Sequence, residues 1–384
     1  MAYKITTPLV GGGTRKKEII DSNQNLTVDE IRTNNISREI IFQGRNVGIN
    51  AGGVSSQSIL PLHINPAPPY YNTTEFFYTA FKTTFPFSSD ATLTTRAPYN
   101  AYEGTGAAGA ASDTHGYRAG GAYYDVQPFP APGPDFIAEF TVRKFPFANL
   151  DATFSTVGNL VGPQYGFAMV GNSSSTTGYA SSGRTKTVPF GSPPFGDQPV
   201  SDIQKFPFST DADCTDVGDT TTNKSYSAGQ SSTENGYISG GNTYPPYTTV
   251  TNVIEKFPFA SEGNSADVGD LFQSRRNVAG ISSSTHGYSA GGESGPTPAS
   301  TSVNIIDKFT FASNNNATDV GDLTVAKHDG SGISGFNSGY FFGGAFPPGT
   351  TQSSLEKFSF SSDGNSTTVG NADIGAQGGT GIQD

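Results

Sequence analysis

The sequence predicts an all-β fold, a six-bladed β-propeller. Three observations support this prediction: the composition, an aromatic tetrapeptide that recurs six times, and four strand-like segments in each repeat. Gly (48 residues) and Pro (25) are abundant, only 14% of residues are charged, and Phe and Tyr together number 45. Short aromatic strands separated by Gly, Pro, Asn and Asp turns fit this composition, whereas long amphipathic helices need more Leu, Ala, Glu and Lys.

The tetrapeptide contains two Phe residues separated by one residue. It reads KFPF in three copies, KFTF and KFSF in the last two, and TFPF in a degenerate first copy. The two Phe side chains share one face of a strand because side chains alternate along a strand. We expect them to pack between adjacent blades, with about 2–3 kcal/mol from each buried ring. The residues expected to do so are Phe85, Phe87, Phe145, Phe147, Phe206, Phe208, Phe257, Phe259, Phe309, Phe311, Phe358 and Phe360.

Each tetrapeptide opens a longer repeat. From Lys144 onward, the first residues of successive copies lie 61, 51, 52 and 49 positions apart. After the tetrapeptide come a turn such as SEGN, a second strand such as ADVGDL, a third such as VAGIS and a fourth such as HGYSAGG. Four short strands in a unit of roughly 50 residues are the spacing of a propeller blade.

The number of tetrapeptides and of Gly-pair strands predicts six blades, with seven as the alternative. The last copy stops after its third strand, whereas NVGINAGG at 46–53 resembles HGYSAGG. A propeller must hide the sheet edges at its seam. We therefore expect residues 46–53 to close the seam blade with residues 378–384, within a propeller that covers 46–384. EFFYTAF at 75–81 is an alternative seam strand.

Residues 1–45 lie outside the repeat. Residues 1–50 carry seven Lys or Arg against five acids, so the remaining chain has a net charge of −13 in the total of −11. A polar, mildly basic segment before a self-contained ring is interpreted as an extended arm that docks the ring to another protein. A leader that wraps the surface is the alternative.

The segment order resembles the kelch repeat. The match is the pattern GG…NVIEKFPF…DVGDLFQSRR, with Arg275 or Arg276 at the Arg position of that family. This resemblance covers roughly residues 46–384 and implies a propeller rather than a function. One departure is that kelch blades normally carry a Trp in the hairpin, and this chain has no Trp.

The sequence contains no pattern that indicates catalysis, a metal or a cofactor. His115 and His286 share one repeat position with Thr, Asn and Ser of other copies, which indicates a polar strand entrance; His63 and His328 have no partner at metal-ligand spacing. The Asp-x-x-Asp motifs at 216–219, 267–270 and 319–322 recur at hairpin positions, where turn chemistry is favoured over calcium binding. The single Cys214 aligns with Ala and Thr, so it is expected to fill space.

The long loops that follow the Gly pairs are the predicted contact surface. They recur at one point in the repeat, so on a propeller they would line one face. Their Tyr, Asn, Ser and Gly content suits adaptable contacts. The candidate contact aromatics are Tyr123, Tyr124, Phe129, Phe195, Tyr244, Tyr247 and Phe346.

In overall style the chain resembles bacteriophage virion proteins, in particular tail and fibre proteins of marine phages. The shared features are a short docking leader followed by Gly-, Thr-, Ser- and Asn-rich β repeats with few charges. The resemblance implies a non-enzymatic, homo-oligomeric structural protein whose arm binds other virion proteins. Its ring would serve tail assembly or bind a host receptor or surface glycan. A capsid-surface decoration protein and a carbohydrate-active propeller enzyme (sialidase- or lyase-like) are the alternatives.

Charge and hydropathy limit the classes of partner that the chain is expected to bind. The acidic body argues against a nucleic-acid partner, because phosphate binding needs clustered Lys and Arg. No apolar run of membrane-spanning length occurs, and the N-terminus lacks the apolar core of a signal peptide. We therefore expect synthesis in a host cytoplasm, localisation in the virion, and no insertion into a membrane.

Overall fold

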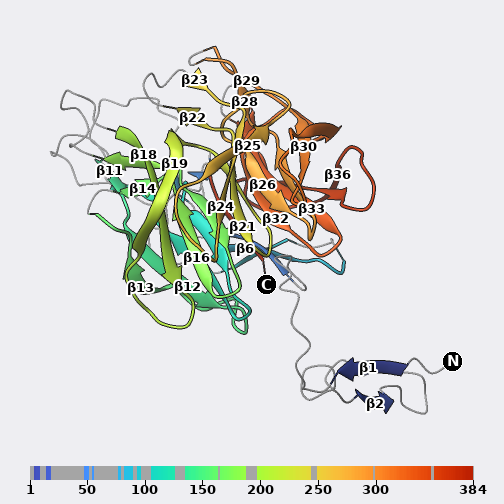
Figure 1. Ribbon diagram of the computed structural model, residues 1–384. Helices are drawn as coiled ribbons and strands as arrows, with labels where there is room; N and C mark the ends of the chain where they lie inside the picture. Colours follow the sequence, from blue (N-terminus) through green and yellow to red (C-terminus); the bar gives the residue numbers. More distant parts are fainter. Residues whose placement is uncertain are drawn as a thin grey trace, which may run out of the picture. The chain divides into compact units, whose positions relative to one another are not determined.

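A computed structural model describes residues 4–8, 14–18, 47–51, 54–55, 77–78, 82–89, 93–96, 105–125, 135–162, 165–186, 197–243, 249–296, 299–346 and 350–383. The chain divides into two compact units, Met1–Ile40 and Ile41–Asp384. In the first unit, β1 (Lys4–Pro8) pairs with β2 (Thr14–Glu18) as an antiparallel hairpin. All regular elements of the described residues are strands (Figure 1), and none is a helix that could span a membrane.

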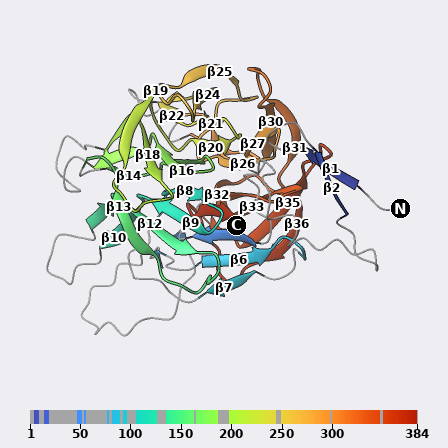
Figure 2. The ribbon, with the colours of Figure 1, turned by 60° about the horizontal axis from the view of Figure 1, so that its bottom comes forward.

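The described strands of the second unit form a six-bladed β-propeller, which confirms the predicted fold class (Figure 2). Each blade has four antiparallel strands that follow the same order. Blade 1 contains β37 (Thr380–Gln383), β3 (Val47–Ala51), β6 (Lys82–Pro86) and β7 (Thr94–Arg96). Blade 2 contains β8 (Ala108–Ala111), β9 (His115–Ala119), β12 (Thr141–Pro146) and β13 (Ser155–Asn159). Blade 3 contains β15 (Val170–Ser173), β16 (Thr177–Ser181), β18 (Asp197–Pro207) and β19 (Thr215–Ser225).

The next three blades repeat the arrangement with nearly constant strand lengths. Blade 4 contains β20 (Ala228–Ser231), β21 (Asn235–Ser239), β24 (Val253–Pro258) and β25 (Ala266–Asp270). Blade 5 contains β26 (Ala279–Ser282), β27 (His286–Ala290), β30 (Ile305–Thr310) and β31 (Thr318–Asp322). Blade 6 contains β32 (His328–Ser334), β33 (Ser338–Phe346), β35 (Ser354–Ser359) and β36 (Thr367–Asn371). The first strands of neighbouring blades contact one another around the ring, so they line its axis.

Blade 1 joins the two ends of the ring. Its innermost strand β37 comes from the C-terminal end and pairs with β3, with Ile49 opposite Ile382. These strands belong to the two segments, 46–53 and 378–384, for which the sequence predicts a seam. The alternative seam segment at 75–81 contains β5 (Phe77–Tyr78), which pairs with β4 (Val54–Ser55) in a two-stranded sheet apart from the four-stranded sheet of blade 1.

Aromatic side chains pack each blade against the next. Tyr237 of blade 4 lies against the Phe pair of blade 5, with its ring centroid 5.4 Å from that of Phe309 and 4.8 Å from that of Phe311. In each blade the first Phe of the tetrapeptide is buried and the second is partly buried. Equivalent contacts use Tyr117, Tyr179, Tyr288 and Tyr340. At the seam, Ile49 takes the Tyr position and packs in one cluster with Phe145 and Phe147.

The innermost strands approach so closely that only Gly fits where their backbones meet. A Cβ on Gly280 would overlap the carbonyl oxygen of Gly229 in the preceding blade, and the same overlap recurs from blade to blade. The backbones must touch because six short strands share one axis. The six residues of this ring are Gly109, Gly171, Gly229, Gly280, Gly332 and Gly381.

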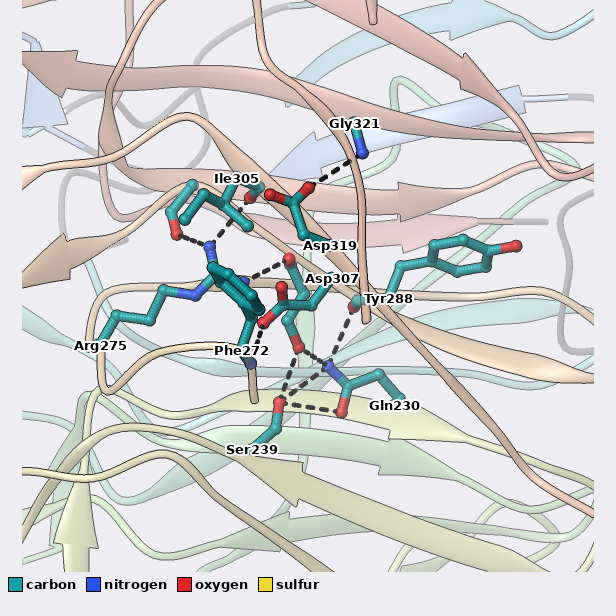
Figure 3. A network of polar contacts seen from close by, with 11 residues as sticks. Gln230, Ser239, Phe272, Arg275, Tyr288, Ile305, Asp307, Asp319 and Gly321 are labelled. Atoms are coloured by element: carbon teal, nitrogen blue, oxygen red, sulfur yellow. Dashed lines mark hydrogen bonds and ion pairs between the residues drawn. The ribbon is translucent and has the colours of Figure 1, made fainter. Parts of the chain in front are cut away.

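Buried polar networks add to the packing between blades (Figure 3). In the network between blades 4 and 5, the Arg275 guanidinium contacts the Asp307 carboxylate at 2.7 Å and donates hydrogen bonds to the carbonyl oxygens of Gly291, Ser289 and Ile305. Burial raises the pKa of the Asp307 carboxyl in spite of Arg275 beside it. Two neighbouring interfaces carry the same kind of pair, Lys224–Glu255 and Lys327–Glu356.

Candidate binding face of the propeller

The two faces of the ring differ in the connections that they carry. Within each blade the innermost strand begins at the face where the second strand ends, because the two are antiparallel. Consequently, the connections from strand two to strand three and the connections between blades share one face, which we call the loop face. The turns from strand one to two and from three to four lie at the other face, the turn face. The long variable segments of the sequence therefore gather at the loop face.

On the loop face, the connection between strands two and three forms a short antiparallel ribbon in every blade. In blade 1 this ribbon is β4 with β5. In blades 2 to 6, in that order, the ribbons are β10 (Ala122–Asp125) with β11 (Asp135–Ala138), β17 (Arg184–Lys186) with the start of β18, β22 (Asn242–Thr243) with β23 (Thr249–Val250), β28 (Glu293–Ser294) with β29 (Thr301–Ser302), and the end of β33 with β34 (Thr350–Thr351). The sequence predicts loops in these connections. The structure differs in that short paired strands form the base of each loop. The ribbons surround the axis, so they form the rim of a candidate binding face.

The candidate contact aromatics fall partly on these ribbons. Tyr123 and Tyr124 belong to β10, opposite Ile137 and Phe136 of β11. Phe346 ends β33 and is half-buried opposite Thr350. The other four candidates, Phe129, Phe195, Tyr244 and Tyr247, lie outside the described residues.

A ring of six residues encircles the axis where the innermost strands begin. Each has a left-handed backbone conformation, with φ between 55° and 70°. The backbone N–H groups donate around the ring to the carbonyl oxygen of the preceding blade, for example from Asn277 to Tyr226 at 2.8 Å and from Asp329 to Asn277 at 3.1 Å. Between blades 2 and 3, Met169 donates to Gly106 at 3.0 Å. The six residues are Gly106, Ala168, Tyr226, Asn277, Asp329 and Gly378.

Four of these positions keep a side chain in a conformation that favours Gly. The left-handed conformation costs a non-Gly residue about 1–2 kcal/mol, less for Asn and Asp. Gly106 and Gly378 avoid this cost, whereas Tyr226, a bulky residue with φ of 60°, does not. Strained residues that persist at one place indicate a role beyond packing. We therefore regard the side chains of this ring as the candidate site.

A recess lies at the axis beside this ring. Its volume is about 100 Å³, and its wall contains Tyr226, Asn277 and Asp329 on one side and the small residues Gly106, Ala168 and Gly378 on the other. Because three of the six positions have little or no side chain, one half of the ring leaves room for a ligand. Hydrogen-bonding groups come from the other half.

Charged residues of blades 4 to 6 surround Asp329. The Arg276 Nε donates to the Glu293 carboxylate at 3.0 Å, and the second Glu293 oxygen lies 3.6 Å from His328 Nε2. His328 Nε2 in turn lies 4.0 Å from the Asp329 carboxylate. Asn277 donates its amide to Glu293 at 3.5 Å. These contacts fix the side chains that flank the recess.

The Asp329 carboxyl is the group most affected by these surroundings. Burial raises its pKa to about 6; the neighbouring His328 and Arg276 act in the opposite direction, and Glu293 adds to the rise. Its side chain is 29% exposed, so the carboxyl remains open to a ligand. A partly exposed carboxyl that titrates near neutral pH is a candidate for a functional group.

The sequence alone predicts no functional role for His328, Asp329 or Glu293. His328 has no partner at metal-ligand spacing along the sequence, but the β28–β29 ribbon brings Glu293 within reach. One signal is present in the sequence: RRN at 275–277 aligns with KHD at 327–329, so polar residues recur where the innermost strand begins.

Among the described residues, no group of three or more His, Cys, Asp or Glu is arranged to hold a metal.

The other residues considered in the sequence analysis, in the Asp-x-x-Asp motifs and at His286 and Cys214, make contacts that stabilise turns or fill the core. Asp267 of the Asp-x-x-Asp motif accepts a hydrogen bond from the backbone of Gly269, and Asp270 donates its backbone N–H to Asn316 of the next blade. His286 contacts the hydroxyl of Thr285 at the turn face. Cys214 is buried, and burial raises the pKa of its thiol to about 12.

Comparisons with known proteins inform the fold. No protein-family model matches the sequence, and no curated protein is significantly similar to it. Among solved structures, the chain is similar to one titled "Structure of YjhT", with a TM-score of 0.60 and 12% identity over 76% of this chain and 93% of that one. A likeness at this level of identity supports the propeller fold alone.

Proposed function

We propose that this chain is a non-enzymatic binding platform of a bacteriophage virion. In this proposal, residues 1–45 anchor the chain to other virion proteins, and the loop face of the propeller contacts a host receptor, a surface glycan or a neighbouring tail protein. A tail-associated or fibre location is preferred, and the virion is expected to carry the chain as a homo-oligomer.

One structural observation carries the binding role. Six ribbons surround an axial recess on one face of a ring that is closed by backbone contacts and stacked aromatic rings. Variable segments on a rigid scaffold are the usual architecture of a binding surface. The N-terminal hairpin forms a compact unit of its own, which suits a separate attachment function.

The kelch-like and virion-like style of the sequence supports the finer part of the proposal. The acidic, repeat-rich ring and the mildly basic leader are the features that suggest a virion component. Labelling whole virions with antibodies against the purified chain tests the location. Label at the tail or fibres supports the preferred role, label over the capsid surface supports the decoration alternative, and absence of the chain from virions contradicts both.

A binding assay tests the loop face. Two exposed Phe residues allow a matched comparison: Phe272 lies in the connection between blades 4 and 5 on the loop face, and Phe336 lies in a turn on the turn face. We expect Phe272→Ser to weaken adsorption of the full chain to host cells or to a glycan array several-fold, and Phe336→Ser to leave it unchanged. Equal effects of both variants would contradict a loop-face contact.

The enzyme alternative has its own test. Purified full-length chain is incubated with host surface polysaccharide, and release of shorter products is followed. A non-enzymatic platform leaves the polysaccharide intact. Cleavage that persists after thorough purification and is lost in Asp329→Asn would favour the carbohydrate-active alternative instead.

A further inference from the structure

Two residues of the wall of the axial recess carry hydrogen-bond acceptors for which the described part of the structure shows no donor. The Oδ1 atom of Asn277 is buried and has no hydrogen-bond partner. Within the part of the chain that the structure describes, the Asp329 carboxylate is 4.0 Å from its ion-pair neighbour His328, which exceeds hydrogen-bond distance. Both residues line the same recess and are neighbours in the left-handed ring. A buried acceptor without a donor costs free energy, so a ligand that donates there would be favoured.

We propose that this recess binds a primary ammonium group, held by the Asp329 carboxylate and Asn277 Oδ1. The proposal goes beyond the platform role and does not depend on a virion location. An ammonium group has three donors and no acceptor, and it therefore complements these two acceptors. The volume of about 100 Å³ corresponds to a few water molecules, which is enough for the ammonium group and its adjoining methylene carbons.

The electrostatic surroundings favour a cation over a neutral donor. The charged and titratable groups that face Asp329 are His328, Glu293 and Arg276. Glu293 neutralises Arg276 through their 3.0 Å contact. Burial and Glu293 disfavour the charged form of the Asp329 carboxyl and raise its pKa, whereas His328 and Arg276 act in the opposite direction. An external cation would also favour the charged form.

Ammonium groups occur both on amino sugars and on Lys side chains. The experiment therefore uses glucosamine and Nα-acetyl-lysine methylamide as probes, each paired with its N-acetylated, uncharged counterpart. Backbone amide shifts of the full-length chain are followed by NMR at about pH 7.5, where Asp329 is ionised. We expect at least one amine to shift resonances around residues 277 and 329 with a dissociation constant of about 10 mM or tighter, and its acetylated counterpart to bind at least tenfold more weakly.

Variants separate recognition of the charge from loss of the fold. Asp329→Asn keeps a residue that tolerates the left-handed conformation, so it should fold normally and bind the amine at least tenfold more weakly. Asp267→Asn, an exposed carboxylate of the outermost strand, is the matched control and should bind like the original chain. Unchanged thermal unfolding in both variants confirms that the fold is intact.

The dependence on pH gives a second readout. Affinity should fall about tenfold for each pH unit below about 6, because protonation removes the carboxylate charge. His328→Gln should retain the loss of affinity in acid, with its midpoint at a higher pH, because His328 lowers the pKa of the Asp329 carboxyl. Binding of glucosamine alone identifies a sugar-borne ammonium, and binding of the Lys derivative alone identifies a protein-borne one; either result supports the proposal. No amine binding, equal binding of the acetylated probes, or retained affinity in Asp329→Asn overturns it.

Discussion

Tyr237 of blade 4 stacks on Phe311 of blade 5, with ring centroids 4.8 Å apart and ring planes at 25°. The same Tyr touches Phe309, the first Phe of that tetrapeptide, at 5.4 Å. The tetrapeptide of one blade therefore packs against the Tyr side chain of the preceding blade, and each copy of the repeat stabilises its neighbour. The aromatic repeat is thus a feature of the ring rather than of the single blade.

Removing one of these rings should destabilise the whole propeller. Phe309 is 4% exposed, and its replacement by Ala leaves a cavity between two blades. We expect Phe309→Ala to lower the free energy of unfolding by about 3–5 kcal/mol in denaturant titrations. Phe272→Ala is the control, since Phe272 is 62% exposed and its loss should change stability by at most about 0.5 kcal/mol. Similar effects of the two variants would contradict the packing role.

The close approach of the Gly backbones at the ring axis leads to a second prediction. In Gly280→Ala the new Cβ would overlap the backbone carbonyl of Gly229, which cannot move without displacing another blade. Gly263→Ala is the matched control: its φ of 106° disfavours Ala, but no atom lies within 4 Å of the new Cβ. We expect the control to lose about 1–2 kcal/mol and Gly280→Ala at least twice as much in thermal or denaturant unfolding. Equal losses would contradict the steric argument, because Gly280 has no positive φ and its replacement carries no conformational cost of the kind seen at Gly263.

Much of the fold could be predicted because its determinants repeat in sequence. The Phe pairs, the Gly pairs and the turn residues recur at constant spacing, and each has a local physical meaning. The seam is predicted because the last copy stops after its third strand and residues 46–53 keep the Gly residues of the strand that it lacks, although Ile49 stands where other copies have Tyr. The buried ion pairs recur as well: an acid precedes the first Phe by two residues at Glu255, Asp307 and Glu356.

The left-handed ring could not be predicted in this way. Its members share a backbone conformation and hydrogen bonds to the neighbouring blade, but their residue types differ from copy to copy and include Gly106, Ala168 and Tyr226. The conformation arises when the ring closes, and a single repeat does not contain that information. Similarly, His328 meets Glu293 only because a loop-face ribbon folds back beside the axis.

The buried pair Lys327–Glu356 should make stability depend on acid pH. Burial alone would raise the pKa of the Glu356 carboxyl, but the Lys327 ammonium and the hydrogen bonds from Lys327, Ser366 and the Thr324 backbone outweigh burial and hold it below 4.5. A carboxyl whose pKa is lowered by folding contributes stability above its unfolded pKa, and this contribution is lost as pH falls through the folded value. We therefore expect Glu356→Gln to flatten the decline in unfolding free energy below about pH 4.5.

At neutral pH the same variant should be strongly destabilised. Removing one member of a buried pair leaves Lys327 charged without its partner, which costs about 3–5 kcal/mol. The exposed pair Lys308–Asp363 provides the control, and Asp363→Asn should change the unfolding free energy by less than about 1 kcal/mol. A comparable loss in both variants, measured in urea at neutral pH, would contradict the distinction between the buried and the exposed pair.

Deletion of the C-terminal strand should open the seam. Removing residues 377–384 eliminates β37, exposes the edge of β3 and removes Ile382, which is buried at the seam. The remaining ring would end in an unpaired strand edge, which favours aggregation. We expect a large fall in the melting temperature, or a loss of soluble protein, together with increased binding of a hydrophobic dye. Deletion of residues 1–40, which form a separate unit, is the control and should leave the melting temperature within about 2 °C. If the C-terminal deletion also left it unchanged, pairing of β3 with β37 would not be what closes the ring.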